Sequence, residues 1–167
     1  MRKIKYIILL LFISKNCFAQ NEIEFREPFT LKLSVDTVSF YEQEVFRSKY
    51  FVKDNILQIY PNESVLIEVE VQKNEIKSMK IVSENKNPSK TIEINFTQKT
   101  DGRKHEYMIL EVKNPFDKVL NYNAMMYIVG RNDWLKTSII PIQPKLTNFE
   151  LWNDVIITIV LSNWRLE

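Results

Sequence analysis

The sequence predicts an all-β domain, an antiparallel sandwich or barrel of seven or eight strands. Apolar and polar residues alternate with a period of two over most of the chain, as in strands with one buried face. Turn-forming residues separate these alternating runs. After the first nineteen residues, no ten-residue window has a convincing helical period.

Five runs alternate clearly, with apolar side chains predicted to face inward and polar ones outward. These runs are residues 29–35, 65–71, 92–96, 108–112 and 120–128. Weaker strands are predicted near 79–81 and 135–140. The last run, 155–161, is apolar on both faces, which predicts a central strand or one covered by a loop. We expect the inward sets to form one core that spans both sheets.

Local signals mark the connections between these strands. Lys73-Asn74 and Asp101-Gly102 are typical of tight hairpins, because these residue types tolerate positive φ. The stretch Asn114-Pro115-Phe116-Asp117 ends a strand at its proline. Pro141 and Pro144 bracket a segment that lacks part of its backbone donors. Residues 40–50 are interpreted as a short helix or an irregular crossover.

The first nineteen residues have the organisation of a secretory signal peptide. Arg2, Lys3 and Lys5 precede an apolar run over residues 6–13, which is too short to span a membrane. Cys17-Phe18-Ala19 then places small residues at positions −3 and −1 of a cleavage site. We therefore expect residues 1–19 to be removed and residues 20–167 to form one exported domain, periplasmic or extracellular, with no membrane span. Acylation of Cys17 would need small or aliphatic residues where Ser14-Lys15-Asn16 stand.

Removal of the signal peptide changes the charge and the cysteine content. Four of the 23 basic residues and no acidic residue lie in residues 1–19, which leaves 19 basic against 21 acidic residues in the domain. A slightly acidic domain lacks the basic footprint of a nucleic-acid-binding protein. The only cysteine, Cys17, is lost with the signal, so we expect burial alone to hold the fold.

One segment resembles a known class of domain. Met108-Ile109-Leu110-Glu111-Val112-Lys113-Asn114, then Pro115-Phe116 and Leu120-Asn121-Tyr122-Asn123-Ala124, is similar to the strand–turn–strand centre of bacterial secreted immunoglobulin-like domains. The resemblance covers about 25 residues, and the Cys-Trp-Cys pattern of antibody domains is absent. It implies an immunoglobulin-like antiparallel β-sandwich over residues 20–167.

Residues that could carry chemistry are few. The single histidine, His105, follows a turn and has no nucleophile or orienting partner in the sequence, so we expect a surface position. One histidine without cysteine does not make a zinc site. The acid pairs Glu22/Glu24 and Glu68/Glu70 lack a calcium-loop pattern and are interpreted as solvated strand faces. The sequence therefore predicts no catalytic residue, no metal and no cofactor.

The tryptophans provide the candidate binding site. Trp164 ends the most apolar strand and is expected to pack in the core. Trp134 and Trp152 each adjoin polar turn residues, a combination that suits stacking and hydrogen bonding to a ligand. The alternative is that both rings cap the open end of the sandwich. The candidate binding residues are Arg131, Asn132, Asp133, Trp134, Trp152, Asn153 and Asp154.

Three hypotheses for function follow from these features. The first is a non-catalytic protein-binding or structural module of the bacterial cell envelope. The second is a carbohydrate-binding domain that uses Trp134 and Trp152, with a polysaccharide as its partner. The third is a hydrolase with scattered acidic residues, which would need a deep acidic cleft.

Overall fold

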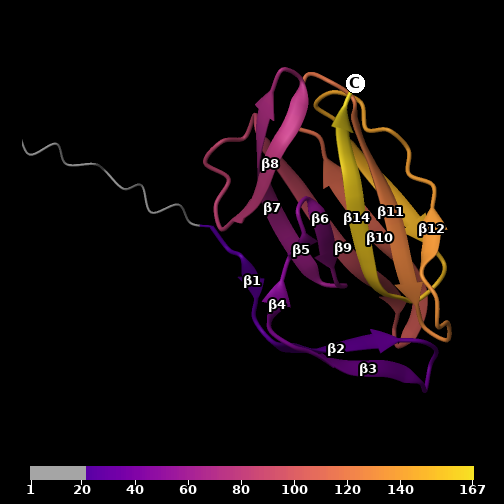
Figure 1. Ribbon diagram of the computed structural model, residues 1–167. Coiled ribbons are helices and arrows are strands. Elements are labelled where there is room, and N and C mark those ends of the chain that lie inside the picture. The colour runs from indigo at the N-terminus through magenta and orange to yellow at the C-terminus, as the bar shows by residue number, and fades with distance from the viewer. Residues whose placement is uncertain (1–21) are drawn as a thin grey trace, which may run out of the picture.

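Two five-stranded antiparallel sheets form the body of the molecule, which is known from a computed structural model that describes residues 22–167 (Figure 1). Sheet I has the strand order β13-β10-β9-β7-β8, and sheet II has the order β12-β11-β14-β6-β5. The strands of sheet I are β7 (Glu63–Gln72), β8 (Glu75–Val82), β9 (Thr91–Asp101), β10 (Lys104–Lys113) and β13 (Thr147–Trp152). The strands of sheet II are β5 (Phe51–Lys53), β6 (Ile56–Ile59), β11 (Leu120–Ile128), β12 (Leu135–Thr137) and β14 (Ile156–Leu166).

The all-β antiparallel fold predicted from the alternation is therefore confirmed, and of the two predicted forms, sandwich or barrel, it is the sandwich. Residues 22–167 contain no helix that is long and apolar enough to cross a membrane. The expected signal peptide, residues 1–19, lies outside the described residues.

The main core lies between the two sheets and is built from the inward residues of the alternating runs. On sheet I, Ile67, Ile94 and Leu110 are fully or almost fully buried. On sheet II, Leu120 and Ile159 face them from β11 and β14. The doubly apolar run is confirmed as a central strand, because β14 lies between β11 and β6.

Both predicted hairpins are present, one of them with a shifted turn. Lys73 and Asn74 have φ of 51° and 68° and join β7 to β8. In the β9–β10 hairpin, Asp101 pairs with Lys104, so the two-residue loop is Gly102-Arg103. Gly102, with φ of 57°, supplies the positive φ, and Asp101 ends its strand instead of entering the loop.

A separate two-stranded ribbon, β2 (Phe29–Ser34) with β3 (Phe40–Val45), crosses one end of the sandwich (Figure 1). Its inward residues Leu31, Leu33 and Val45 are buried with Ile157 of β14 in a second, smaller cluster. The expected core spanning both sheets is therefore confirmed for four of the five alternating runs, but the 29–35 run is not part of it. The alternation of 29–35 correctly indicated a buried face, but that face packs on the outside of sheet II.

The remaining differences concern short strands. Residues 40–50 contain β3 and β4 (Ser48–Lys49) instead of a helix or a crossover, and β4 pairs with β1 (Phe25–Arg26). The described residues form fourteen strands, so seven or eight was too low. Four of the strands that the sequence did not reveal, β1, β4, β5 and β6, have two to four residues, which is too short to show an alternation. The other two, β3 and β13, have six residues each and were missed as well.

The phase of β7 makes a direct stability prediction. Ile67 has no exposed surface in the main core, so Ile67→Ala is expected to lower the free energy of unfolding by about 2–5 kcal/mol, and Leu110→Ala likewise. Glu68 faces outward and pairs with Lys80 at 3.0 Å, so Glu68→Ala is expected to cost about 1 kcal/mol or less. Urea unfolding of the three variants measures this difference. Equal losses at positions 67 and 68 would contradict the phase of the strand.

Candidate functional site

The two turns that carry the candidate tryptophans lie side by side at one end of the sandwich. The backbone N–H of Val129, before the first turn, donates to the carbonyl of Val155, after the second, at 2.9 Å. Arg131, Asn132 and Asp133 are exposed in the first turn. In the second turn, Asn153 and Asp154 are exposed as well. The structure thus brings these polar residues to the same end of the molecule.

The two indoles, however, pack against different clusters: Trp134 contacts Tyr127 of the smaller cluster, and Trp152 packs against the main core. Trp134 is 40% exposed and packs on Tyr127, with 5.5 Å between ring centroids. Tyr127 belongs to the outer cluster under the β2–β3 ribbon. Trp152 is half-buried against the main core, and its Nε1–H donates to the Thr137 hydroxyl at 3.0 Å. Trp152 therefore closes the gap between β13 and β12, and the two rings form no common platform.

The other polar residues considered in the sequence have structural contacts. One ring nitrogen of His105 lies 2.9 Å from Gln98 Nε2, and the other lies 3.1 Å from the Asn153 carbonyl. Glu24 pairs with Lys49. Hydrogen bonds from Asn87 and Lys80 lower the pKa of Glu68 below its usual value. Among residues 22–167, no group of three or more potential metal ligands comes together.

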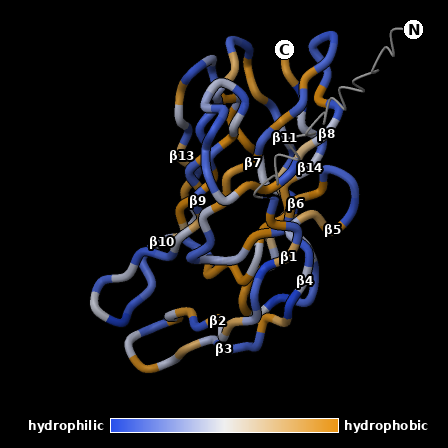
Figure 2. Tube along the Cα trace, turned by 90° about the vertical axis from the view of Figure 1, so that its left-hand side faces the viewer, coloured by the Kyte–Doolittle hydropathy of each residue, from blue (hydrophilic) through white to orange (hydrophobic). Residues whose placement is uncertain are grey.

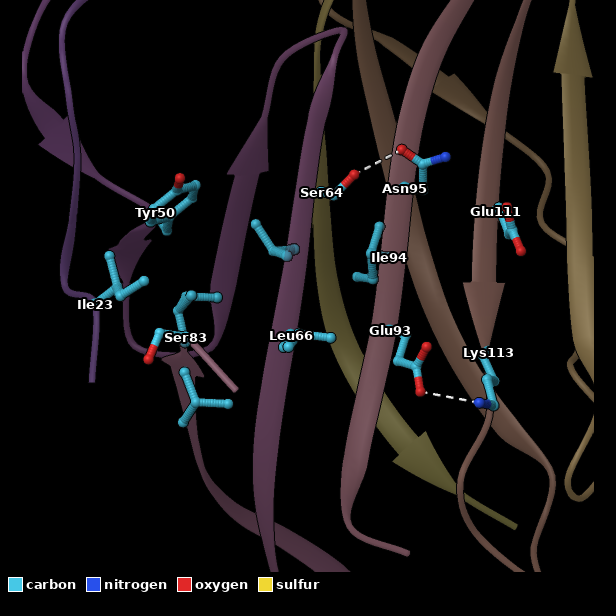
Figure 3. Close-up of a pocket in the computed structure, with 13 residues that line it drawn as sticks. Ile23, Tyr50, Ser64, Leu66, Ser83, Glu93, Ile94, Asn95, Glu111 and Lys113 are labelled. Atoms are coloured by element: carbon cyan, nitrogen blue, oxygen red, sulfur yellow. Dashed lines mark hydrogen bonds and ion pairs between the residues drawn. The ribbon is translucent and has the colours of Figure 1, made fainter. Parts of the chain in front are cut away.

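A cavity of about 590 Å³ on the outer face of sheet I is a stronger candidate site (Figure 3). It lies between the sheet and the N-terminal segment of the described chain. Its lining combines apolar and polar side chains. They include Ile23, Tyr50, Leu66 and Val82 on the apolar side, and Ser64, Glu93, Asn95, Glu111 and Lys113 on the polar side.

The polar side of the cavity is set by the registers of β7, β9 and β10. Ser64 lies opposite Asn95, and the serine hydroxyl donates to Asn95 Oδ1 at 2.9 Å. Glu93 lies opposite Lys113 on β10, and Lys113 Nζ is 2.9 Å from Glu93 Oε1 (Figure 3). Glu111, opposite Asn95, adds a second carboxylate. The side chains can therefore offer hydroxyl, amide, ammonium and carboxylate groups to one ligand.

The apolar wall of the cavity depends on the N-terminal segment. Ile23 is fixed by its N–H, which donates to the Ile81 carbonyl at 2.9 Å. The guanidinium of Arg26 lies over the Tyr50 ring, with 4.6 Å between Arg26 Cζ and the ring centroid. Burial and the nearby Glu63 carboxylate raise the pKa of Tyr50, so its hydroxyl remains a neutral hydrogen-bonding group at physiological pH.

Sequence reasoning did not find this cavity. Ser64, Glu93, Asn95 and Glu111 occupy outward positions of alternating strands, and such positions are normally solvated faces. In the sequence, the local sign of a covered face was the apolar Leu66 at an outward position of β7. In the structure this residue is half-buried. The contribution of Ile23 and Tyr50 depends on chain segments distant in sequence.

Comparisons of the chain with protein-family models, curated proteins and solved structures find no match.

Proposed function

We propose that this chain is an exported, non-catalytic immunoglobulin-like β-sandwich of the bacterial cell envelope that binds a protein partner at the cavity on sheet I. The observation that carries the proposal is the lining of this cavity, an apolar wall beside a row of polar and charged side chains on a sheet face. Specific protein surfaces combine apolar contact area with a few well-placed polar groups. An extended segment with an apolar side chain next to a basic one fits this arrangement.

The charges in the cavity support this choice of segment. The apolar side chain would contact Leu66, Val82 and Ile23. The basic side chain would reach the carboxylate of Glu111. Glu93 is already engaged, because its Oε1 accepts from both Lys113 and Asn85.

A displayed library of random linear peptides tests the proposal. The wild-type protein is expected to enrich peptides that carry an apolar residue adjacent to Lys or Arg. Glu111→Lys is expected to lose these peptides while the protein remains folded, because residue 111 lies on the outer face. Leu66→Lys should lose them as well, and Trp134→Ala is the control that retains them. Enrichment that is equal for the wild type and Glu111→Lys would reject the cavity as the binding site.

A second candidate function rests on Trp134. Its indole is 40% exposed, packs on Tyr127, and follows the exposed residues Arg131, Asn132 and Asp133. An aromatic ring beside polar side chains suits a sugar, as a carbohydrate-binding domain requires. An array of envelope polysaccharides probed with the wild type and Trp134→Ala tests it. Sugar binding that is lost in Trp134→Ala and retained in Glu111→Lys would favour this second function.

Export makes a separate prediction about the N-terminus. Cleavage between Ala19 and Gln20 is expected from the small residues at positions −3 and −1. Intact-mass measurement of the exported protein is expected to give a chain that begins at Gln20. A mass that includes Cys17 with attached lipid would instead assign the segment as a lipoprotein signal.

A further inference from the structure

Strand β13 is an open edge of sheet I, and it differs from the other edge strands of sheets I and II. β5 and β12 are three-residue strands, too short to template much pairing. β8 is partly covered, because Glu22 bridges to Val82 and the Ile23 N–H bonds to the Ile81 carbonyl. β13 has six residues, with neither lysine nor proline, and runs along one margin of the upper half of the molecule in Figure 2.

The pairing of β13 with β10 shows which backbone groups face outward. The N–H of Asn114 donates to the Leu146 carbonyl at 2.9 Å, just before the strand begins. In an antiparallel pair, residues that exchange hydrogen bonds alternate with residues that do not. The even-numbered residues of β13 therefore bond to β10. Thr147, Phe149 and Leu151 direct their N–H and C=O groups toward the open edge.

The side chains next to this edge are unusually apolar. Phe149 is 50% exposed and Leu151 is 55% exposed on the outer face. Ile140 and Leu146, which precede the strand, are 64% and 57% exposed. An apolar cluster beside an unpaired strand edge is a typical site of strand addition.

We propose that β13 pairs antiparallel with β13 of a second copy of this chain, with Phe149 on the two-fold axis. In this register Thr147 lies opposite the partner's Leu151, and Phe149 lies opposite the partner's Phe149. By the two-fold symmetry, Leu151 also lies opposite the partner's Thr147. Each of these three outward-facing pairs exchanges two backbone hydrogen bonds, about six in all. The apolar side chains of Phe149 and Leu151 from both copies then form one continuous row.

The polar side chains on the inner face of β13, Asn148 and Glu150, favour this register. Glu150 Oε1 accepts from Asn148 Nδ2 at 2.8 Å within the chain. With Phe149 on the axis, Asn148 lies opposite the partner's Glu150, so the same amide–carboxylate contact can form between copies. A shift that pairs Phe149 with the partner's Leu151 would place the two Glu150 carboxylates opposite each other, which is unfavourable. A shift by one residue would oppose outward-facing residues to residues already bonded to β10, and larger shifts pair fewer residues of the strand.

Disulfide trapping tests both the partner and the register. In a Cys17→Ser background, Phe149→Cys is expected to give a covalent dimer on mild oxidation, because hydrogen-bonded partners lie about 5.5 Å apart between Cα atoms, within disulfide range. Leu151→Cys is the matched control. Its two copies would lie about 14 Å apart along the strands of the same dimer, so it is expected to give no covalent dimer.

Sedimentation equilibrium of the wild type supplies an independent measurement. The wild type is expected to show a concentration-dependent dimer, and Phe149→Glu is expected to weaken it at least about tenfold, because two carboxylates would then meet at the axis. Phe46→Glu changes a more exposed phenylalanine (78%) away from this edge and should leave the dimer unchanged. A wild type that stays monomeric at every concentration, or equal cross-linking at positions 149 and 151, would overturn the proposal.

Discussion

Replacing Arg26 with methionine is expected to lower the free energy of unfolding by about 3–5 kcal/mol, the usual cost of breaking a buried ion pair. Arg26 is 2% exposed. Its Nε lies 2.9 Å from Glu63 Oε1, and its other nitrogens donate to the Ser48 hydroxyl and to the Lys49 and Gln58 carbonyls. Tyr50 and Tyr60 flank the guanidinium at 4.6 and 5.0 Å. The substitution leaves the Glu63 carboxylate, whose side chain is 11% exposed, without its counter-charge.

Urea unfolding of a small set of variants separates this effect from a general loss of charge. Lys32→Met breaks an ion pair with Glu42 in which both side chains are more than half exposed, so it is expected to cost about 1 kcal/mol or less. Arg26→Lys keeps the positive charge but loses the planar guanidinium. Its loss of stability should therefore lie between those of Arg26→Met and Lys32→Met. Arg26→Met combined with Glu63→Leu is expected to recover part of the loss, because no buried charge then remains unpaired. A loss for Arg26→Met no larger than for Lys32→Met would contradict this account.

The same residue also connects stability to the candidate site. Arg26 holds β1 and β4 against β6 and β7, and this segment carries Ile23 and Tyr50 to the wall of the cavity. We therefore expect Arg26→Met to weaken peptide binding at the cavity even under conditions where the protein remains folded. Leu66, which lies on β7 itself, should keep its environment in this variant.

Asn114→Asp is the second substitution with a large expected effect, a loss of at least about 3 kcal/mol at neutral pH. The Asn114 side chain is fully buried. Its Nδ2 lies 2.7 Å from the Lys118 carbonyl and 3.0 and 3.1 Å from the carbonyls of Ile142 and Gln143. Its Oδ1 accepts from the Phe116 N–H at 2.9 Å. Aspartate has nearly the same shape but would direct a carboxylate at three carbonyl oxygens.

The pH dependence of this variant distinguishes charge from shape. Burial among carbonyls is expected to raise the pKa of the new carboxyl above its unfolded value. A group with a raised pKa of this kind destabilises the fold at high pH, and the penalty shrinks as the pH falls through the folded-state pKa. Asn123→Asp, at an exposed position of β11, is the control and should change stability little. A penalty for Asn114→Asp that does not depend on pH would contradict the electrostatic explanation.

Asn114 shows how far the sequence reached at one position. The stretch Asn114-Pro115-Phe116-Asp117 was predicted to end a strand, and β10 ends at Lys113. The sequence did not show that the asparagine side chain also binds the segment between Pro141 and Pro144. That segment was expected to pair poorly, yet Ile142 forms an isolated bridge with Leu120 and is buried. The contact joins residues 28 positions apart, which no local pattern encodes.

The period-two patterns were enough to predict which face of each alternating strand is buried, and the turn-forming residues predicted where these strands end. Alternation indicates the buried face because successive side chains on a strand point to opposite faces. A run that is apolar on both faces, as in β14, must be covered on both. The segment that covers each buried face is known only from the three-dimensional packing. It placed the β2–β3 ribbon outside sheet II, joined Arg26 to Glu63, and formed the cavity from Ile23, Tyr50 and the outward side chains of sheet I. These contacts depend on how distant segments meet in space, and a period-two pattern records that a face is buried without recording against which segment.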